Sequence, residues 1–421
     1  MLTPQENERL TRVGPGTPMG KVFRRYWLPA ALSTELPEPD GAPVRVRILG
    51  EDLVAFRATD GEVGLVSAYC PHRRAPLFFG RNEEQGLRCV YHGWKFDTTG
   101  ACVDMPSEPP DSLFKSKVTV ESYPTYEAGG IIWTYMGPAG TAPEPPGYEL
   151  LRVPATHRFV SKTFEYANFA QALEGGLDTA HSSFLHNMNL GDKSFLRNAD
   201  TAPRLEVERT DYGFRYAGIR AVGSEDYVRV YHYIMPTTQL RGFVSGNQGK
   251  NHLPTIHGHF WIPIDDETTS VYNFMYSFYP EQPLSLEYAI QRETDAGRGP
   301  DDLIPGTFKL KQNLANDYFI DRHVQKTQTF TGIPGINTQD IALQEGMGSI
   351  VDRSKEHLGT TDRAIIVTRQ LLLEAADEVE KDGEPRARDP QTYAGVRAAD
   401  RLIPSGTRWQ DALKEDVVAK Y

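Results

Sequence analysis

Apolar and polar residues alternate with a two-residue period in the first third of the chain, as they do in half-buried β-strands. The alternation is clearest over residues 44–49 and 53–57, on either side of the turn sequence Gly50-Glu51-Asp52. Further strand-like segments cover residues 63–69 and 130–135. Short strands joined by turns of this kind predict a small unit rich in β-structure.

The pattern changes on both sides of this unit. The first forty residues predict a helical lead-in, and a run rich in Pro and Gly from residue 137 to 147 is typical of a linker. We therefore expect three regions: a lead-in over residues 1–40 that packs on the larger domain, a small β-rich domain over residues 41–150, and the larger domain over residues 151–421.

The larger domain combines helices with strands that are grouped together. A helical pattern near residues 170–187 precedes the strands, and residues 364–379 carry an apolar stripe with a helical period. The strands expected between them cover residues 205–207, 214–219, 228–234, 260–264 and 271–278. Because these strands do not alternate with helices, the sequence predicts an α+β fold.

Composition narrows the function classes. The 421 residues suffice for two domains, and a formal net charge of −11 without a dense Lys/Arg run argues against nucleic-acid or anionic-membrane partners. No segment approaches about twenty apolar residues, and the N-terminus lacks the apolar core of a signal peptide. With only three cysteines, and so no disulfide framework, a soluble cytoplasmic protein is expected.

Four side chains that can bind metal fall into two tight pairs in the small domain. The first pair is Cys70-Pro71-His72 and, after sixteen residues, the second is Cys89-Val90-Tyr91-His92. Two Cys and two His in this order are the ligand set of a Rieske-type 2Fe–2S cluster, with two thiolates on one iron and two imidazoles on the other. Such a cluster transfers single electrons and needs an acceptor.

Two other interpretations of these residues compete with the cluster. The cysteines could be small buried apolar residues beside ordinary loop histidines, but four such residues rarely form two tight pairs by chance. A structural zinc site is the stronger rival. Zinc pairs usually run Cys-x2–4-Cys and His-x3–5-His, whereas each pair here mixes the two residue types. The spacing therefore favours the cluster and leaves Cys102 without a partner.

A second group of possible ligands lies just past the linker. Asp178 precedes His181 by three residues, and His186 follows five residues later. Two imidazoles and one carboxylate suit a non-haem iron with open positions. On a continuous helix, at about 100° per residue, the two imidazoles would diverge by about 140°. A helix must therefore end or distort between them, and the hydroxyls of Ser182 and Ser183 could satisfy the freed backbone groups.

Asp178 is better suited to accept a hydrogen bond from a ligating imidazole than to bind the ion itself. The simpler alternative, a helix with two polar-face histidines, loses weight because the same chain carries the cluster motif. The third ligand must come from elsewhere, and residues 338–345 offer Asp340 and Glu345. Spacing alone does not choose between these two. Alternatively, both could be ordinary acidic residues on the solvent-exposed face of a helix.

Cys-x-His-x16-Cys-x2-His followed by Asp-x2-His-x4-His resembles the Rieske non-haem iron ring-hydroxylating oxygenases, specifically their large (alpha) terminal oxygenase subunit. The resemblance covers nearly the whole chain, and residues 173–186, 325–333 and 339–346 are similar to the phthalate dioxygenase branch. It implies a β-rich Rieske domain beside a helix-grip catalytic domain, whose curved antiparallel sheet encloses a mononuclear Fe(II). It also implies that His181, His186 and Asp340 bind this iron.

One position departs from the family pattern. Some relatives have an Asn near the iron, four residues before the aspartate that matches Asp178, where this chain has Glu174. Any iron contact of that amide would here have to come from Asn168 or Gln171 nearby. The resemblance gives Asp178 itself a bridging role, between the iron of one subunit and the cluster histidine of its neighbour.

The family also implies an assembly and an electron source. A head-to-tail trimer, or a hexamer of two stacked trimers, is expected because the cluster and the iron of one subunit lie too far apart for fast transfer. The chain contains no Gly-x-Gly-x-x-Gly fingerprint of a dinucleotide site. Electrons should therefore come from NADH through a separate flavin/iron–sulfur reductase.

The resemblance suggests an aromatic carboxylate as substrate, and a carboxylate is best bound by a fork-shaped cation. Arg204, which opens an expected strand, and Arg241 match the substrate-binding arginines of phthalate dioxygenases. Arg220 is a competitor for this role, and a surface position is the simpler alternative for any one of them.

We expect a terminal oxygenase that uses O₂ and NADH-derived electrons for cis-dihydroxylation of a phthalate-like aromatic acid, in aromatic hydrocarbon catabolism. An alternative within the same class is a monooxygenase that O-demethylates a methoxylated aromatic acid. A Rieske electron carrier is an alternative from another class, and it would need only about one small domain of chain.

Overall fold

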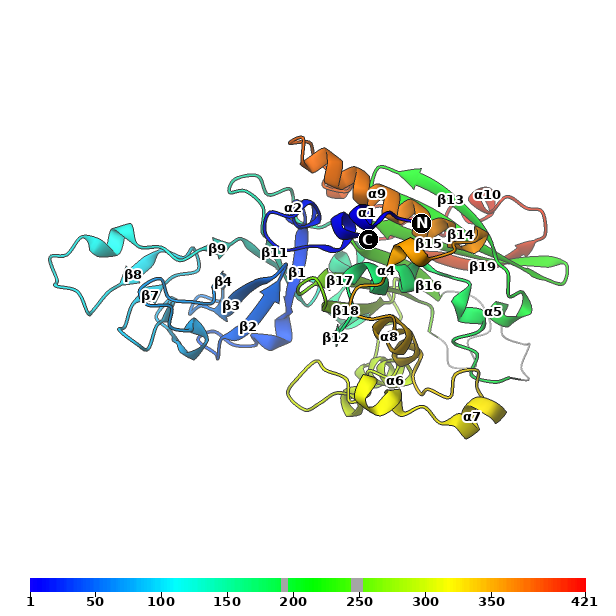
Figure 1. Ribbon diagram of the computed structural model, residues 1–421, viewed down its shortest axis with the longest axis horizontal. Coiled ribbons are helices and arrows are strands. Elements are labelled where there is room, and N and C mark those ends of the chain that lie inside the picture. Colours follow the sequence, from blue (N-terminus) through cyan, green and yellow to red (C-terminus); the bar gives the residue numbers. More distant parts are fainter. Residues whose placement is uncertain (191–195, 244–252) are drawn as a thin grey trace.

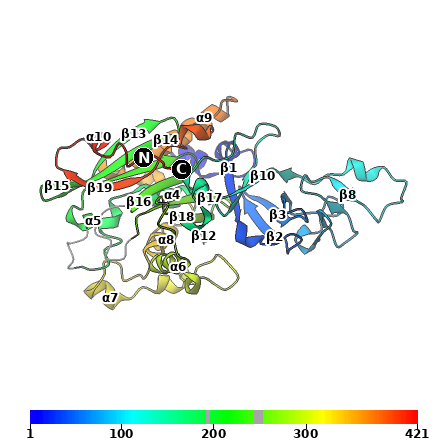
Figure 2. The ribbon, with the colours of Figure 1, turned by 180° about the vertical axis from the view of Figure 1, so that it is seen from behind.

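The structure is a computed structural model that describes residues 1–190, 196–243 and 253–421. It is elongated, with a small β-rich body at one end and a larger body of strands and helices at the other (Figure 1). The view from behind shows the same division (Figure 2). The expected α+β fold, with a small β domain beside a larger domain that contains an antiparallel sheet, is confirmed.

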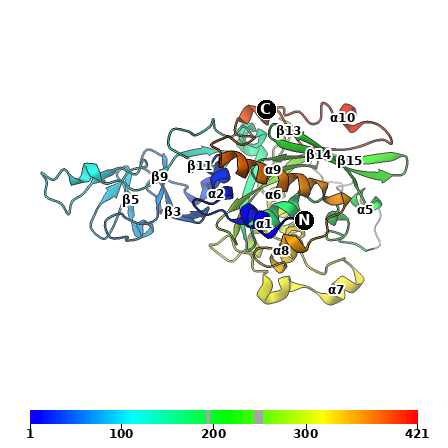
Figure 3. The ribbon, with the colours of Figure 1, turned by 45° about the horizontal axis from the view of Figure 1, so that its top comes forward.

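Two short helices and one strand make up the N-terminal segment. Helices α1 (Pro4–Thr11) and α2 (Pro18–Phe23) each begin with Pro after a threonine whose hydroxyl accepts a backbone N–H of the first turn. Both helices pack against α9 (Arg363–Val379) of the larger body (Figure 3). Strand β1 (Trp27–Leu32) pairs with β11 (Ile131–Tyr135), so this part of the expected helical lead-in is extended.

Three antiparallel sheets form the small body, in the orders β1-β11-β10, β2-β3-β4-β9 and β5-β6-β7-β8. Their further strands are β2 (Val44–Ile48), β3 (Glu51–Arg57), β4 (Val63–Ser67), β5 (Arg81–Glu83), β6 (Gly86–Arg88), β7 (Lys95–Phe96), β8 (Cys102–Asp104), β9 (Ser122–Tyr123) and β10 (Thr125–Ala128). Phe56 and Val66 of the second sheet share one buried core with Leu87 and Phe96 of the third. This core also contains Cys70 and Cys89, so it supports the cluster motif directly.

An antiparallel sheet forms the larger body, in the order β12-β18-β17-β16-β15-β14-β13, and β19 pairs with β15. Its strands are β12 (Arg158–Glu165), β13 (Arg204–Thr210), β14 (Gly213–Val222), β15 (Glu225–Ile234), β16 (Thr238–Phe243), β17 (Thr255–Pro263), β18 (Thr269–Tyr276) and β19 (Ala399–Pro404). The five strands that the sequence predicts correspond to β13, β14, β15, β17 and β18, and the other three are additional.

Helices lie over this sheet, and one of them, α8, carries the candidate ligand Asp340. Helix α4 (Phe169–Leu177) packs against β17, and α8 (Ile336–Gly346) packs against α4. The other helices are α3 (Glu149–Arg152), α5 (Leu196–Ala199), α6 (Leu286–Asp295), α7 (Arg322–Thr327) and α10 (Trp409–Ala412). Among the helices of the described residues, none is long and apolar enough to cross a membrane.

Helix α4 comes close to both neighbours because it carries two adjacent glycines. A Cβ atom at Gly175 would lie 1.9 Å from Nε2 of Gln344 on α8. A Cβ atom at Gly176 would lie 2.2 Å from the ring of Trp261 on β17. Both distances are below any real carbon contact. The close approach of α4 to β17 therefore requires Gly176, whereas the flexible end of the Gln344 side chain could move away from a Cβ atom at Gly175.

Candidate metal centres

Two loops of the small body hold the four candidate cluster ligands in matching turns. The N–H of Cys70 donates to the carbonyl of Ala75 over 2.9 Å, and the N–H of Cys89 donates to the carbonyl of Trp94 over 2.8 Å. The residue before each acceptor has a positive φ, 60° in the first loop and 79° in the second. The two cysteines therefore occupy equivalent places in two turns of the same shape.

The thiols of these loops are buried, whereas the imidazoles reach the surface. Cys70 and Cys89 are each 2% exposed, while His72 is exposed and His92 is half-buried. The two imidazole rings are 4.4 Å apart, and His72 stacks on Trp94 at 4.5 Å. Burial and the neighbouring Cys89 raise the pKa of the Cys70 thiol to about 11. Two thiolates at this place need a bound cation, and the donor set fits a 2Fe–2S cluster.

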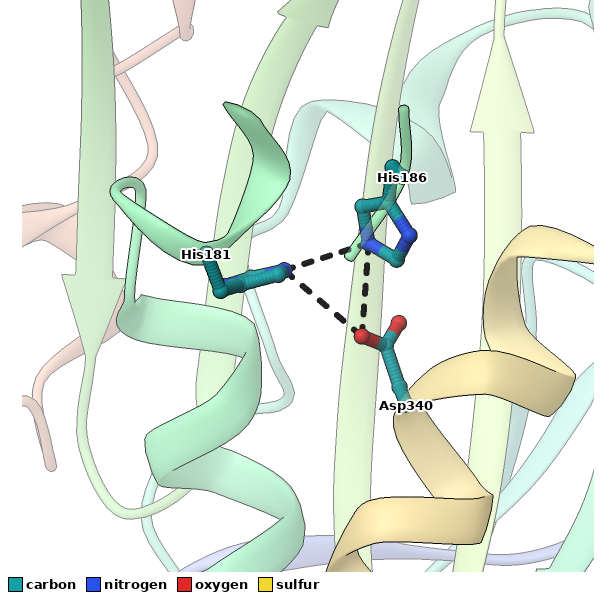
Figure 4. Close-up of side chains that lie close together, drawn as sticks. All are labelled: His181, His186 and Asp340. Atoms are coloured by element: carbon teal, nitrogen blue, oxygen red, sulfur yellow. Dashed lines mark hydrogen bonds and ion pairs between the residues drawn. The ribbon is translucent and has the colours of Figure 1, made fainter. Parts of the chain in front are cut away.

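The second group of ligands converges at one point of the larger body. Helix α4 ends at Leu177, a 3₁₀ turn covers His181–Ser183, and the chain then brings His186 back toward His181. Asp340 comes from α8, and Figure 4 shows the three side chains pointing toward one another. The helix thus ends before His181, which removes the angular conflict of a continuous helix.

The distances between the three donor atoms fit a single metal ion. Nε2 of His181 lies 3.1 Å from Nε2 of His186, and Oδ1 of Asp340 lies 3.6 Å and 3.3 Å from these two nitrogens. Ligand atoms about 2.1 Å from one ion and near right angles to one another are about 3 Å apart. Within the described ranges, this is the one group of His, Cys, Asp and Glu residues whose ligand atoms lie close enough together to hold a single ion.

Contacts of the two Nδ1 atoms fix which nitrogen of each imidazole faces the point where the three ligands converge. Nδ1 of His186 donates to Oε1 of Gln339 over 2.9 Å, because the amide nitrogen of Gln339 is used on the carbonyl of Ile333. Nδ1 of His181 lies 3.4 Å from Oδ2 of Asp178. Both Nε2 atoms therefore turn lone pairs toward Asp340, and three lone pairs at this spacing repel unless a cation joins them.

Asp178 lies where the sequence places a partner of the imidazole. Its Oδ1 accepts the N–H of Ala180 over 2.7 Å, and its Oδ2 faces His181. Burial raises its pKa, but these partners outweigh burial and hold the pKa of Asp178 below its ordinary value. The side chain is thus set up as an anionic hydrogen-bond acceptor beside the candidate metal site.

The structure distinguishes the two acidic candidates of α8. The carboxylate of Glu345 accepts hydrogen bonds from the N–H of Tyr166 and the hydroxyl of Tyr318. Burial raises the pKa of Glu345, whereas His186 and His181 more than offset burial at Asp340 and lower its pKa. Only Asp340 is brought into the group with metal-binding geometry.

Glu174, the position that departs from the family pattern, has a structural role. Glu174 accepts hydrogen bonds from Arg353 and Arg369, which fix α4 to the segments around α9. Asn168 caps α4 and also donates to two backbone carbonyls, and Gln171 is used on backbone groups of α8 and of the segment after it. The expectation that Asn168 or Gln171 substitutes near the iron is therefore wrong, because both amides are committed elsewhere.

A cavity of about 180 Å³ opens beside the triad, and Asp178, His181, His186 and Asp340 line it. Its sheet-side wall comes from strands β12, β18, β17, β16 and β15, and its remaining wall from α4, α6 and α8. Arginine side chains lining it are Arg229, Arg241, Arg292 and Arg298. Arg298 is neutralised by Glu293 at 2.8 Å, and Arg292 faces Asp295 at 3.7 Å.

The three arginines considered for substrate binding lie in different places. Arg241 on β16 lines the cavity, as the substrate role requires. Arg204 does not, because it opens edge strand β13, has a side chain that is 62% exposed and pairs with Glu206. Arg220 is fully buried but does not line the cavity. The structure therefore leaves only Arg241 of the three in contact with the candidate substrate space.

Two residues that the sequence motifs do not single out lie beside the candidate ligands. Trp94 stacks on His72, and Gln339 orients His186. Gln339 is adjacent to Asp340 on α8, and a polar residue next to an acidic ligand candidate was the one available signal. Trp94 lies two residues after His92, where its ring could be assigned to the core alone.

Two family models match the chain. A Rieske [2Fe-2S] domain model matches residues 26–124, and a model described as LigXa C-terminal domain like matches residues 134–420. The chain belongs to the Rieske non-haem iron oxygenases, as a large terminal oxygenase subunit. Its cofactors are a Rieske 2Fe–2S cluster and a mononuclear iron, its co-substrate is O₂, and a separate reductase supplies electrons. The electron-carrier alternative finds no support.

Curated relatives place the chain in the phthalate dioxygenase-like branch. The phthalate 4,5-dioxygenase oxygenase subunit of Pseudomonas putida is 42% identical, over 89% of this chain and 86% of the relative. The 3-chlorobenzoate-3,4-dioxygenase oxygenase subunit of Comamonas testosteroni is 37% identical over 99% of both chains. The 5,5'-dehydrodivanillate O-demethylase oxygenase subunit of Sphingobium sp. (strain NBRC 103272 / SYK-6) is 31% identical, over 100% of this chain and 90% of the relative.

Solved structures agree with the fold. NdmA of Pseudomonas putida CBB5, as its QL mutant with theobromine, superposes with a TM-score of 0.63 at 20% identity. The match covers 93% of this chain and 99% of NdmA.

Substituting Gln339 tests how His186 is oriented. We expect Gln339→Leu to weaken iron binding about 10- to 100-fold, because Nδ1 of His186 loses its acceptor and the ring can turn. Iron content after dialysis against a graded chelator measures the effect. Gln312→Leu is the control, since Gln312 is a buried glutamine that bonds Asp302 instead of a candidate ligand. Equal iron retention in the two variants would contradict the orienting role.

Proposed function

We propose that the chain hydroxylates an aromatic carboxylic acid, by phthalate-like cis-dihydroxylation. The observation that carries this substrate class is Arg241. Its Nη2 donates to Nε2 of His259 over 2.7 Å, and its Nε is buried without a hydrogen-bond partner in the part of the chain that the structure describes. His259 is neutral, because burial and Arg241 lower its pKa well below the ordinary value.

Arg241 is thus a cation that lines the cavity and forms no ion pair with any residue that the structure describes, although the charge of Asp340 acts on it across the same cavity. Burial lowers its pKa to about 10, so the group is still charged near neutral pH. A buried charge that lacks a partner is destabilising by several kcal/mol, and a carboxylate is the anion whose geometry matches a guanidinium. A substrate carboxylate bound at Arg241 would leave its aromatic ring in the cavity toward the triad.

The proposed ligands are Cys70, His72, Cys89 and His92 for the cluster, and His181, His186 and Asp340 for the iron. Iron bound by the triad would supply open coordination positions at which O₂ is activated. Asp178 holds His181 by its Nδ1 and is the proposed route for electrons between the two metal sites. The rest of the cavity wall binds and orients the substrate.

Isotope-labelled oxygen tests this function. Supplied with ¹⁸O₂, a reductase and phthalate, the enzyme should form a cis-diol that carries two ¹⁸O atoms.

The second candidate, O-demethylation of a methoxybenzoate, is supported by the relative named as an O-demethylase. That reaction gives a phenol and releases one equivalent of formaldehyde. Turnover of methoxybenzoates alone, with formaldehyde as a product, would contradict the dihydroxylase proposal.

The binding role of Arg241 leads to a comparison of two arginines. We expect Arg241→Gln to raise KM for phthalate about 10- to 100-fold, because a charge-assisted hydrogen bond of about 1.5–3 kcal/mol is lost. Arg204→Gln should leave KM within about twofold, since Arg204 is an exposed residue outside the cavity. Steady-state kinetics of the two purified variants measure both values. An unchanged KM for Arg241→Gln would contradict the assignment.

We also propose that the chain works as a head-to-tail trimer, or as two stacked trimers, in the cytoplasm. The loops that carry the cluster ligands belong to the small body, and the triad lies within the larger body (Figure 1). Large apolar side chains are exposed at both places: Phe79, Val90 and Tyr91 near the cluster loops, and Phe184 and Phe330 near the triad. Exposed apolar residues on both sides suit a contact between subunits.

Mixed assemblies test transfer between subunits. A Cys70→Ala chain should lack the cluster and a His186→Ala chain should lack the iron, so each alone should be inactive. Co-expressed with different tags and purified by both, the mixed trimers should regain about one-third of wild-type activity, because one cluster in each ring then faces one intact iron site. Analytical ultracentrifugation establishes the assembly size. Inactive mixed trimers that contain both metals would contradict the arrangement.

A further inference from the structure

A buried arginine on β14 forms no ion pair with any residue that the structure describes. Arg220 is 0% exposed, and burial lowers its pKa. Its guanidinium donates to the carbonyl oxygens of Thr179, at 2.6 Å, and Asp200, at 3.2 Å. The carboxylate of Asp200 lies nearby, but it accepts the N–H of Ala221 at 3.2 Å. A charge held in this way is costly to bury, so its place in the fold calls for an explanation.

The shortest of these hydrogen bonds ends on the loop between α4 and the first candidate iron ligand. The carbonyl of Thr179 and the N–H of Ala180 belong to the same planar peptide unit. That N–H donates to Oδ1 of Asp178 over 2.7 Å. The other oxygen of Asp178 faces Nδ1 of His181 at 3.4 Å. One peptide group therefore connects the cation of Arg220 to the carboxylate that holds His181.

We propose that Arg220 is the positioning residue of Asp178. By holding the Thr179 carbonyl, it fixes the plane of the peptide unit between Thr179 and Ala180, and so the direction of the Ala180 N–H that donates to the Asp178 carboxylate. Its charge also polarises this peptide, which strengthens the hydrogen bond at the far end. The inference deepens the proposed function, because it takes Asp178 as the route between the two metals.

A second contact fixes the same loop from the side of the cavity. The hydroxyl of Thr179 lies 3.0 Å from the hydroxyl of Tyr231, and Nη1 of Arg220 lies 3.4 Å from the same Thr179 oxygen. Tyr231 lines the cavity and pairs across the sheet with Arg241. The loop that carries Asp178 is thus held by sheet residues on two sides, and Arg220 supplies the only charge among these contacts.

Three variants separate positioning from general stability. In Arg220→Gln the charge is removed, in Arg220→Lys it is kept with fewer donors, and in Arg397→Gln a different buried arginine, paired with Glu149, is lost. Each purified variant is reduced chemically with phthalate present, mixed with O₂, and followed by the absorbance of the cluster as it reoxidises. Iron per chain, the electron paramagnetic resonance spectrum of the reduced cluster and KM for phthalate are measured on the same samples.

We expect Arg220→Gln to slow cluster reoxidation by at least about tenfold, because a small displacement of a positioned group has effects of this size. Iron content, the cluster spectrum and KM should stay as in the wild type, and Arg220→Lys should recover part of the rate. In a crystal structure of Arg220→Gln, the 3.4 Å contact between Asp178 and His181 should lengthen. Arg397→Gln should lower the melting temperature and leave the rate unchanged.

Ala180→Pro provides a second route to the same question. Ala180 has a φ of −75°, which proline adopts, and the substitution removes the N–H that donates to Asp178. It should slow reoxidation as Arg220→Gln does. A wild-type rate in Arg220→Gln or in Ala180→Pro, with a slow rate in Asp178→Asn, would overturn the inference and leave the proposed function intact. A wild-type rate in Asp178→Asn would overturn both.

Discussion

The fold must hold three metal-ligating side chains close together although they repel one another. His181 and His186 turn their Nε2 lone pairs toward each other at 3.1 Å, with the carboxylate of Asp340 beside them. Without a cation these groups favour separation, so the elements that carry them must be rigid. The glycine pair of α4, the ion pairs of Glu174 and the close contact between α4 and α8 provide this rigidity.

Much of this arrangement follows from local sequence patterns. The alternation in the small body and the amphipathic helix α9 each leave a periodic signal, because each buries one face. The grouped strands of the larger body are recognisable from their β-branched and aromatic residues instead, since strands such as β17 and β18 are buried along their whole length. The spacing of His181 and His186 predicted that a helix ends or distorts between them, since a continuous helix would separate the two rings, and the structure ends α4 earlier, at Leu177. Local spacing carries no information on contacts between distant segments, and so it did not choose between Asp340 and Glu345.

The positions that sequence reasoning missed depend on such distant contacts. Gln339 orients His186 because α8 packs beside the loop of His186. Trp94 stacks on His72 because the two loops that carry the cluster ligands meet. Arg204 and Arg241 have the same chemistry, yet one opens an edge strand and the other lies on an inner strand that lines the cavity. Nothing within either segment distinguishes them, because the difference lies in which strands pair and what covers the sheet.

The size of the cavity limits the size of the substrate, whereas its charges do not. A space of about 150 Å³ in a protein core holds one benzene molecule, and the cavity beside the triad measures about 180 Å³. One aromatic ring with short substituents fits this space. Gly175 and Gly176, which let α4 approach the sheet so closely, also line this cavity, so the same two residues set both the packing of the helix and one boundary of the substrate space.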